Sequence, residues 1–150
     1  MRFLELLSAE RVRASLDAAD KPGLLGELAT LLAGDEGEKI VRDALTMRER
    51  LGSTGLGHGV AIPHGRSAAV REARAAFVRL AEPIDFGADD KQRVDLVAAL
   101  IVPAHFTDEH LKLLAELAEL FADATVTAAL RAAPDDAALR DELAKGFARS

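Results

Sequence analysis

A run of apolar residues at positions 94–102 constrains the fold more than any other segment, because Asp95 is its one polar residue. A strand of this composition has both faces covered by other elements, as in the buried strands of α/β proteins. Residues 75–80 predict a second strand, and the polar residues 82–93 predict a loop between the two. We therefore expect a buried strand that lies between two layers of other elements.

Helices are expected on both sides of this strand. Asp20 can cap a helix with Pro22 in its first turn, and Thr107 can cap another that ends near Phe121. Hydrophobic periodicity predicts further helices at residues 38–51, 124–132 and 135–147, and further strands at residues 11–16 and 60–62. The residues expected to face the interior from the helices at 38–51 and 107–121 are Ile40, Val41, Ala44, Leu45, Leu111, Leu114, Leu117, Ala118 and Phe121.

The order of these elements predicts the fold class. Strands that alternate with helices around one fully covered strand indicate a three-layer α/β/α sandwich with a mixed sheet. No linker, internal repeat or low-complexity tract divides the sequence, so residues 1–150 are expected to form a single domain.

The composition excludes several classes of function. The net charge is −6 and aromatic residues make up 4% of the chain, so neither nucleic acid nor an anionic membrane surface is an expected partner. The absence of cysteine excludes disulfide bonds and thiolate chemistry, which leaves histidine to carry any soft-nucleophile chemistry. No leader and no run of roughly 18 apolar residues is present, so we expect a cytoplasmic protein without membrane insertion.

The segment at residues 52–59 contains four glycines in eight positions, which suits backbone that approaches a ligand closely. It leads into the short apolar strand at 60–62, which Pro63 terminates or places at a sheet edge. His64 follows just beyond this strand, where a side chain can face a cleft, and Gly65 permits the exit turn. His64 is therefore the first candidate for chemistry.

The chain has four histidines, at positions 58, 64, 105 and 110. A histidine taken alone is more often a surface or hydrogen-bonded structural residue than a catalyst. Context favours His64 and His110, because the end of a strand and the start of a helix are natural edges of a cleft. In the third helical position, His110 would lie near unpaired N–H groups and the positive end of the helix dipole, which suits an anion and favours a neutral imidazole.

Arg48 is the candidate for binding an anion beside these histidines. Its guanidinium is permanently charged and its fork of donors matches the oxygens of a phosphoryl group. It also lies at the end of the helix at 38–51, where basic side chains commonly complement the helix dipole and do nothing more. The pattern alone leaves both interpretations open.

Two separated motifs resemble one known family. Residues 48–65 read RERLGSTGLGHGVAIPHG, similar to the active-site signature of fructose/mannitol-type enzyme IIA domains of the bacterial phosphoenolpyruvate-dependent phosphotransferase system. Within that class the chain most resembles the stand-alone nitrogen-regulatory IIA proteins. Residues 94–114 resemble the strand, proline turn and histidine-bearing helix of the same family. His58 departs from the pattern, in which a small polar residue such as Asn is common, and a second imidazole near His64 could alter its protonation.

The resemblance implies a phosphoryl carrier in which His64 is phosphorylated through Nε2, while His110 and Arg48 stabilise the phosphoryl group. The donor would be a small histidine-containing phosphocarrier protein (HPr- or NPr-like), whose basic surface suits an acidic chain. No metal or other cofactor is implied. The turn residues expected around the phosphoryl group are Ser53, Thr54, Gly55, Gly57, Gly59 and Gly65.

The resemblance leaves the use of this carrier open. Because the sequence contains no IIB or membrane IIC domain, regulation through phosphorylation-dependent binding of transporters or sensor kinases is the favoured role. The alternative is a sugar-specific transport IIA protein that passes its phosphoryl group to a separate IIB protein. A metal hydrolase that uses the four histidines is disfavoured, because no two of them have the i, i+4 spacing common in zinc sites.

Overall fold

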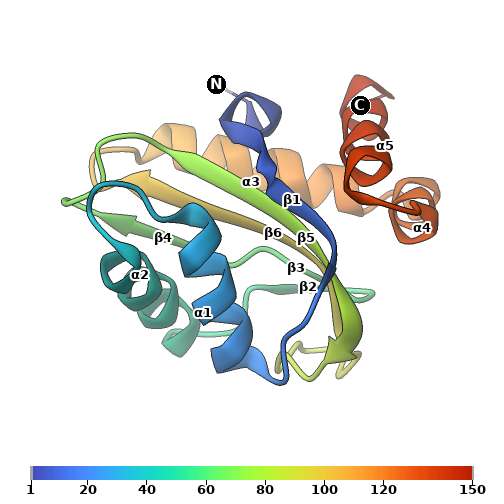
Figure 1. The fold of residues 1–150 in the computed structure, drawn as a ribbon, viewed down its shortest axis with the longest axis horizontal. Coiled ribbons are helices and arrows are strands. Elements are labelled where there is room, and N and C mark those ends of the chain that lie inside the picture. Colours follow the sequence, from blue (N-terminus) through green and yellow to red (C-terminus); the bar gives the residue numbers. More distant parts are fainter. Residues whose placement is uncertain (1, 150) are drawn as a thin grey trace.

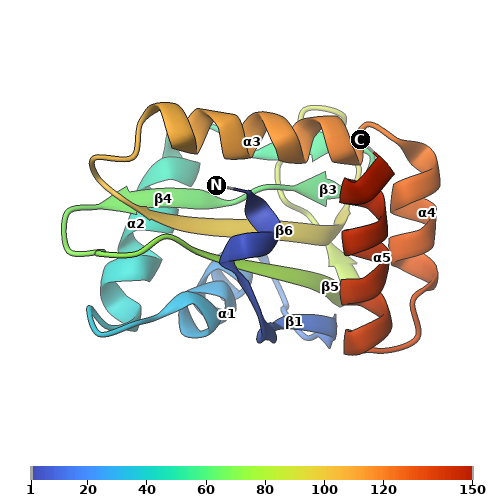
Figure 2. The same cartoon turned by 90° about the horizontal axis from the view of Figure 1, so that it is seen from above.

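The structure is a computed structural model that describes residues 2–149. Within these residues a six-stranded mixed sheet separates two helical layers, and Figures 1 and 2 show α1 and α2 on one side of it and α3, α4 and α5 on the other. Each layer closes its own apolar core against the sheet. The predicted three-layer α/β/α sandwich with a mixed sheet is confirmed.

The elements follow in this order: a 3₁₀ helix (Phe3–Leu6), β1 (Leu7–Leu16), α1 (Lys21–Leu32), α2 (Glu38–Arg50), β2 (Gly55–Gly57), β3 (Val60–Ala61), β4 (His64–Ser67), β5 (Arg74–Ile84), β6 (Val94–Pro103), α3 (Asp108–Phe121), α4 (Ala124–Ala132) and α5 (Asp136–Arg149). The sheet order is β1-β5-β6-β3-β2, and β4 also pairs with β6.

Strand β6 is the centre of the sheet. It pairs antiparallel with β5 on one side and parallel with β3 and then β4 on the other. Its residues from Leu96 to Val102 are all buried, because helices cover both faces of the sheet at this strand. The prediction of a fully covered central strand is confirmed.

The predicted helix starts are correct in position but differ in their capping bonds. The Asp20 carboxylate accepts a hydrogen bond from the Gly23 N–H at 2.8 Å and caps α1 as expected. Thr107 occupies the cap position of α3, but its backbone is helical and its hydroxyl makes no capping bond. His110 is still the third residue of α3.

The predicted buried face of α3 is wrong at two positions. The side chain of Leu111 is 66% exposed and Ala118 is exposed, whereas His110, Leu113, Leu117, Leu120 and Phe121 are buried. The helix is therefore rotated from the expected orientation, and its buried face includes His110, a polar residue that an apolar pattern does not select. Ile40 in α2 is likewise more exposed than expected, at 38%.

The segment after Pro63 is a strand rather than a turn. Residues 64–67 form β4, in which His64 pairs with Leu100 of β6. Pro63 lies at the break between β3 and β4, and its carbonyl accepts a hydrogen bond from the Leu100 N–H at 3.1 Å. Gly65 is required for space and not for an exit turn, since a Cβ there would lie 2.8 Å from the backbone carbonyl carbon of Ala44 in α2.

Candidate functional site

A cavity of about 780 Å³ opens between α2, β4 and the start of α3. His64, His110 and Arg48, which lie on three different elements, all line it. The other lining residues are Ala44, Met47, Leu51, Gly65, Arg66, Ala104, Thr107, Leu111 and Leu114. The structure thus brings together the three side chains that the sequence selected.

The orientation of the His64 ring is fixed by its own strand. Nδ1 lies 2.7 Å from the Ile62 carbonyl oxygen, and because a carbonyl can only accept, Nδ1 must carry the hydrogen. The neutral ring then leaves the lone pair on Nε2. Burial lowers the pKa of His64, and the positive charge of Arg48 lowers it further, against the opposing effect of the Ile62 hydrogen bond. His64 is therefore held neutral, with an unprotonated Nε2.

His110 lies edge-on to His64. The two ring centroids are 5.1 Å apart and the ring planes meet at 83°. Nε2 of His110 is buried, and it has no hydrogen-bond partner among the described residues. Burial lowers the pKa of His110 to about 4, with smaller contributions from His64 when that ring is protonated and from the permanent positive charges of Arg66 and Arg48. The expected neutral imidazole is found, but burial rather than the helix dipole is the main cause.

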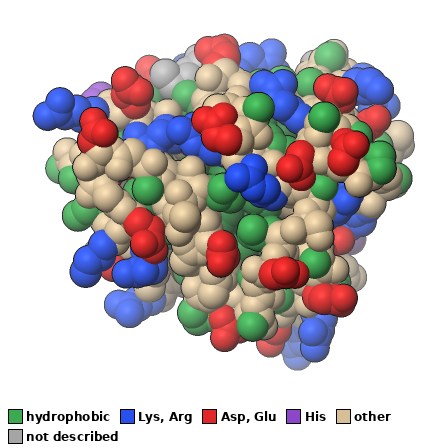
Figure 3. Space-filling model, in the orientation of Figure 1, with side chains coloured by type: hydrophobic (Ala, Val, Ile, Leu, Met, Phe, Trp, Pro, Cys, Tyr) green, Lys and Arg blue, Asp and Glu red, His purple; other side chains and the backbone are tan. Residues whose placement is uncertain are grey.

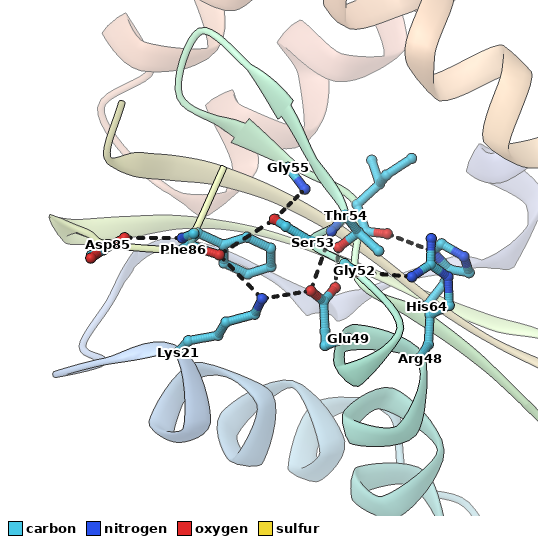
Figure 4. A network of polar contacts seen from close by, with 12 residues as sticks. Lys21, Arg48, Glu49, Gly52, Ser53, Thr54, Gly55, His64, Asp85 and Phe86 are labelled. Carbon is cyan, nitrogen blue, oxygen red and sulfur yellow. Dashed lines mark hydrogen bonds and ion pairs between the residues drawn. The ribbon is translucent and has the colours of Figure 1, made fainter. Parts of the chain in front are cut away.

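Arg48 points toward the His64 ring from the last turn of α2 (Figure 4). Its Nη1 donates a hydrogen bond to the Gly52 carbonyl at 2.9 Å, which fixes the guanidinium at the mouth of the glycine-rich segment. Arg66, which the sequence analysis did not select, also lines the cavity. Arg66 is two residues from His64, so both side chains lie on one face of β4. Had β4 been predicted as a strand, this spacing would have identified Arg66 as a site residue.

The glycine-rich segment supports the site from behind rather than lining it. None of its residues is among those that line the cavity, and of the predicted turn residues only Gly65, in β4, is found there. Ser53 donates to the Phe86 carbonyl at 3.4 Å and accepts from the Gly55 N–H at 3.1 Å, and Thr54 is buried. Gly57, at the end of β2, and Gly59, in the two-residue hairpin turn, have φ of 93° and 82°, which glycine adopts without strain.

His58 and His105 lie outside this cavity. His58 is exposed at the tip of the β2–β3 hairpin, where its N–H donates to Asp90 and its carbonyl accepts from Arg131. His105 is exposed and packs edge-on against Phe106. The concern that His58 would perturb the protonation of His64 finds no support in this placement.

The rim of the cavity is apolar, with Met47, Leu51 and Leu111 at 67%, 84% and 66% exposure. Arg48 and Arg66 are the charged lining residues, and within residues 2–149 no carboxylate lines this cavity. On the face shown in Figure 3, acidic and basic side chains are interspersed rather than segregated. The net negative charge of the chain is therefore not carried by the cavity wall.

A metal hydrolase would need a cluster of metal-ligating side chains. Across residues 2–149, no group of three or more His, Cys, Asp or Glu side chains is arranged to hold a metal ion. None of the helices in this described part is long and apolar enough to cross a membrane.

Comparison with known proteins identifies the family. The family described as "Phosphoenolpyruvate-dependent sugar phosphotransferase system, EIIA 2" matches residues 5–146. A nitrogen regulatory protein of Bradyrhizobium diazoefficiens is 39% identical over 96% of this chain and 95% of its own length. A fructose-specific EIIA component of Haloferax volcanii is 34% identical over 95% of this chain and 91% of its own length.

A solved structure agrees with these matches. The nitrogen regulatory protein IIA-Ntr from Neisseria meningitidis superimposes with a TM-score of 0.89 at 37% identity, over 93% of this chain and 97% of the other. The resemblance inferred from the two motifs is confirmed. With the family matched along nearly its whole length and the fold reproduced, the chain belongs to the EIIA 2 family of phosphotransfer components in the phosphoenolpyruvate-dependent sugar phosphotransferase system.

Proposed function

We propose that the protein is a cytoplasmic phosphoryl carrier that accepts a phosphoryl group on Nε2 of His64 from a phosphohistidine of an HPr- or NPr-like carrier protein. The observation that carries this proposal is the hydrogen bond from Nδ1 of His64 to the Ile62 carbonyl oxygen. It commits the ring to the tautomer with a free Nε2 lone pair, in a residue that lines an open cavity.

The transfer step uses this lone pair as the nucleophile. Nε2 of His64 forms a bond to phosphorus while the P–N bond of the donor phosphohistidine breaks, and that electron pair returns to the donor imidazole. Acceptor and donor are both imidazoles, so the exchange is close to isoenergetic and catalysis consists of positioning and charge stabilisation. No metal is required in this step.

Arg48 and His110 are the residues proposed to stabilise the transferring group. The Arg48 guanidinium offers paired donors to its equatorial oxygens. The buried Nε2 of His110, which lacks a partner in the described structure, is suited to donate one further hydrogen bond to a phosphoryl oxygen. In this role His110 assists transfer without itself becoming phosphorylated.

The rim of the cavity suits a protein donor. Exposed Met47, Leu51 and Leu111 surround a cavity of about 780 Å³, a volume that suits one phosphohistidine side chain of a partner protein. Burial of such a rim against a carrier protein would exclude water from the transferring phosphoryl group.

For the use of the phosphoryl group, we favour regulation through phosphorylation-dependent binding of transporters or sensor kinases. The nitrogen regulatory relatives, matched over almost their whole length, support this role. The fructose-specific relative supports the alternative of a sugar-transport IIA protein that passes its phosphoryl group to a separate IIB protein. Affinity capture with phosphorylated and unphosphorylated protein distinguishes them, since identical partner sets would contradict a switch.

The proposed acceptor is tested by transfer from a purified, ³²P-labelled carrier protein in the presence of EDTA, followed by mapping of the labelled residue. We expect an acid-labile label on His64, none in His64→Ala, and slower labelling at the same residue in His110→Ala. His58→Ala, which alters a histidine outside the cavity, is the control and should be labelled at the rate of the unmodified protein. Label that persists in His64→Ala would refute the assignment.

A further inference from the structure

The buried carboxylate of Glu49 lies directly behind the proposed site. It follows Arg48 in the last turn of α2, and its side chain is 4% exposed. Lys21, in the first turn of α1, makes an ion pair with its Oε2 at 2.7 Å. Thr54 donates to it twice, from its N–H at 3.2 Å and from its hydroxyl. Figure 4 shows this network on the side of the glycine-rich segment away from the His64 ring.

These bonds fix a short segment whose carbonyls hold the proposed functional groups. The Gly52 carbonyl accepts from Nη1 of Arg48 at 2.9 Å. The Thr54 carbonyl accepts from the Ile62 N–H at 3.1 Å, and the Ile62 carbonyl is the group that orients the His64 ring. A single carboxylate thus anchors the backbone that positions both the guanidinium and the imidazole.

Lys21 connects the same carboxylate to a third part of the chain. Its Nζ donates to the Phe86 carbonyl at 3.1 Å and lies 4.2 Å from the centre of the Phe86 ring. Ser53 donates to the same carbonyl. The glycine-rich segment, which has little side-chain packing of its own, is therefore held between α1, α2 and the loop that follows β5.

A buried ion pair at this place is not explained by stability alone. The free energy needed to remove two charges from water offsets much of the attraction between them. Replacing such a pair by apolar residues often leaves the stability of the fold unchanged or increases it. A second buried pair, Arg74 with Glu36, has side chains 13% and 5% exposed and lies outside the residues that line the His64 cavity. The two pairs share chemistry and burial, but the Glu49 pair is the one bonded to the segment behind His64 and Arg48.

We propose that Glu49, with Lys21 and Thr54, is a positioning residue for phosphoryl transfer, which sets Arg48 and His64 through segment 52–54. This inference rests on the proposed acceptor role of His64. Loss of the carboxylate's charge releases Lys21 and weakens the hold on Thr54. The expected effect is a transfer rate at saturating carrier roughly tenfold or more below that of the unmodified protein, since small misplacements of reacting groups cost rate steeply.

The test compares Glu49→Gln with the matched control Glu36→Gln, which breaks an ion pair of similar burial elsewhere. Single-turnover transfer from labelled carrier is measured well below the melting temperature of each variant, across a series of carrier concentrations. We expect the maximal rate to fall in Glu49→Gln with the half-saturating carrier concentration unchanged, and both to be unchanged in Glu36→Gln. Nitrogen-15 NMR of the His64 ring should also show faster solvent exchange of the Nδ1 proton in Glu49→Gln alone.

Two further variants keep the inference testable if Glu49→Gln does not fold. Thr54→Val removes the hydroxyl that donates to Glu49 and should slow transfer, whereas Thr54→Ser retains it and should restore the rate. A Glu49→Gln protein that transfers as fast as the unmodified one, or rates that fall equally in both Gln variants, would overturn the positioning role. Failure of the unmodified protein to label at His64 would instead refute the proposed function.

Discussion

The buried imidazole of His110 predicts that stability depends on pH in a defined window. Its native pKa of about 4 lies below its ordinary value of 6.5, so on acidification the unfolded chain binds a proton before the folded protein does. The contribution of neutral His110 is complete above that ordinary value and is lost as the pH falls toward 4. From these two pKa values, the loss at pH 5 is about 2 kcal/mol.

The assay is urea unfolding of the unmodified protein and of His110→Gln at about pH 8 and about pH 5. Glutamine has no titratable group in this range, so the variant removes the His110 contribution and retains the others. Acidification lowers the stability of both proteins through their carboxylates and through His64, whose pKa burial also lowers. The unmodified protein should lose about 2 kcal/mol more than the variant over this interval.

The difference in stability loss between the two proteins is the decisive measurement. If the two proteins lose stability in parallel between about pH 8 and about pH 5, His110 titrates at an ordinary pKa and is not desolvated as its 8% exposure indicates. Direct titration of the ring by NMR in the folded protein provides the second check, since a midpoint near 6.5 would contradict the lowered pKa.

Two substitutions test the backbone around the site. Gly65→Ala would place a Cβ 2.8 Å from the carbonyl carbon of Ala44, so we expect α2 to shift, a loss of about 1–3 kcal/mol in urea unfolding, and slower labelling of His64. Labelling and stability equal to the unmodified protein would show that the packing of α2 on β4 is looser than described. His58→Asn should stabilise the fold by about 0.5 kcal/mol, because His58 has φ of 56° in a two-residue hairpin turn, a conformation that Asn adopts more readily than His. Transfer should be unchanged, and a stability equal to or below that of the unmodified protein would refute the argument about the turn.

The sequence predicted the layers of the fold because its signals are local and strong. The apolar run at 94–102 can only be a covered strand, and the Asp20 cap with Pro22 behind it marks the start of α1 without ambiguity. The long helices have apolar residues at helical spacing, which also locates them along the chain. The rotation of a helix about its axis is harder to predict, as the exposure of Leu111 in α3 shows, since this residue was expected to face the interior. His110 takes an inward position that an apolar pattern assigns to leucine.

The site was predicted in outline but not in its supporting contacts. His64, His110 and Arg48 could be selected because strand ends, helix starts and family motifs mark them in the sequence. Strand β4 could not be predicted, since it is only four residues long and mostly polar, and it forms by pairing with β6, which is distant in the sequence. Glu49 was missed for the same reason, because its burial arises from Lys21 and Thr54, whose approach only the tertiary structure supplies.

Burial links the chemistry of the two histidines to the need for a cation beside them. Desolvation lowers the pKa of His64 and of His110, so both rings are neutral near pH 7 and the proposed acceptor, His64, has a free lone pair. The same desolvation would disfavour the dianionic phosphoryl group that the proposed acceptor would receive. A permanent positive charge in the same cavity resolves this conflict, because it further disfavours protonation of the rings and attracts the phosphoryl oxygens. Arg48 meets both requirements only while its guanidinium is held at the cavity wall, which is why the contacts behind it matter as much as the residues that face the partner.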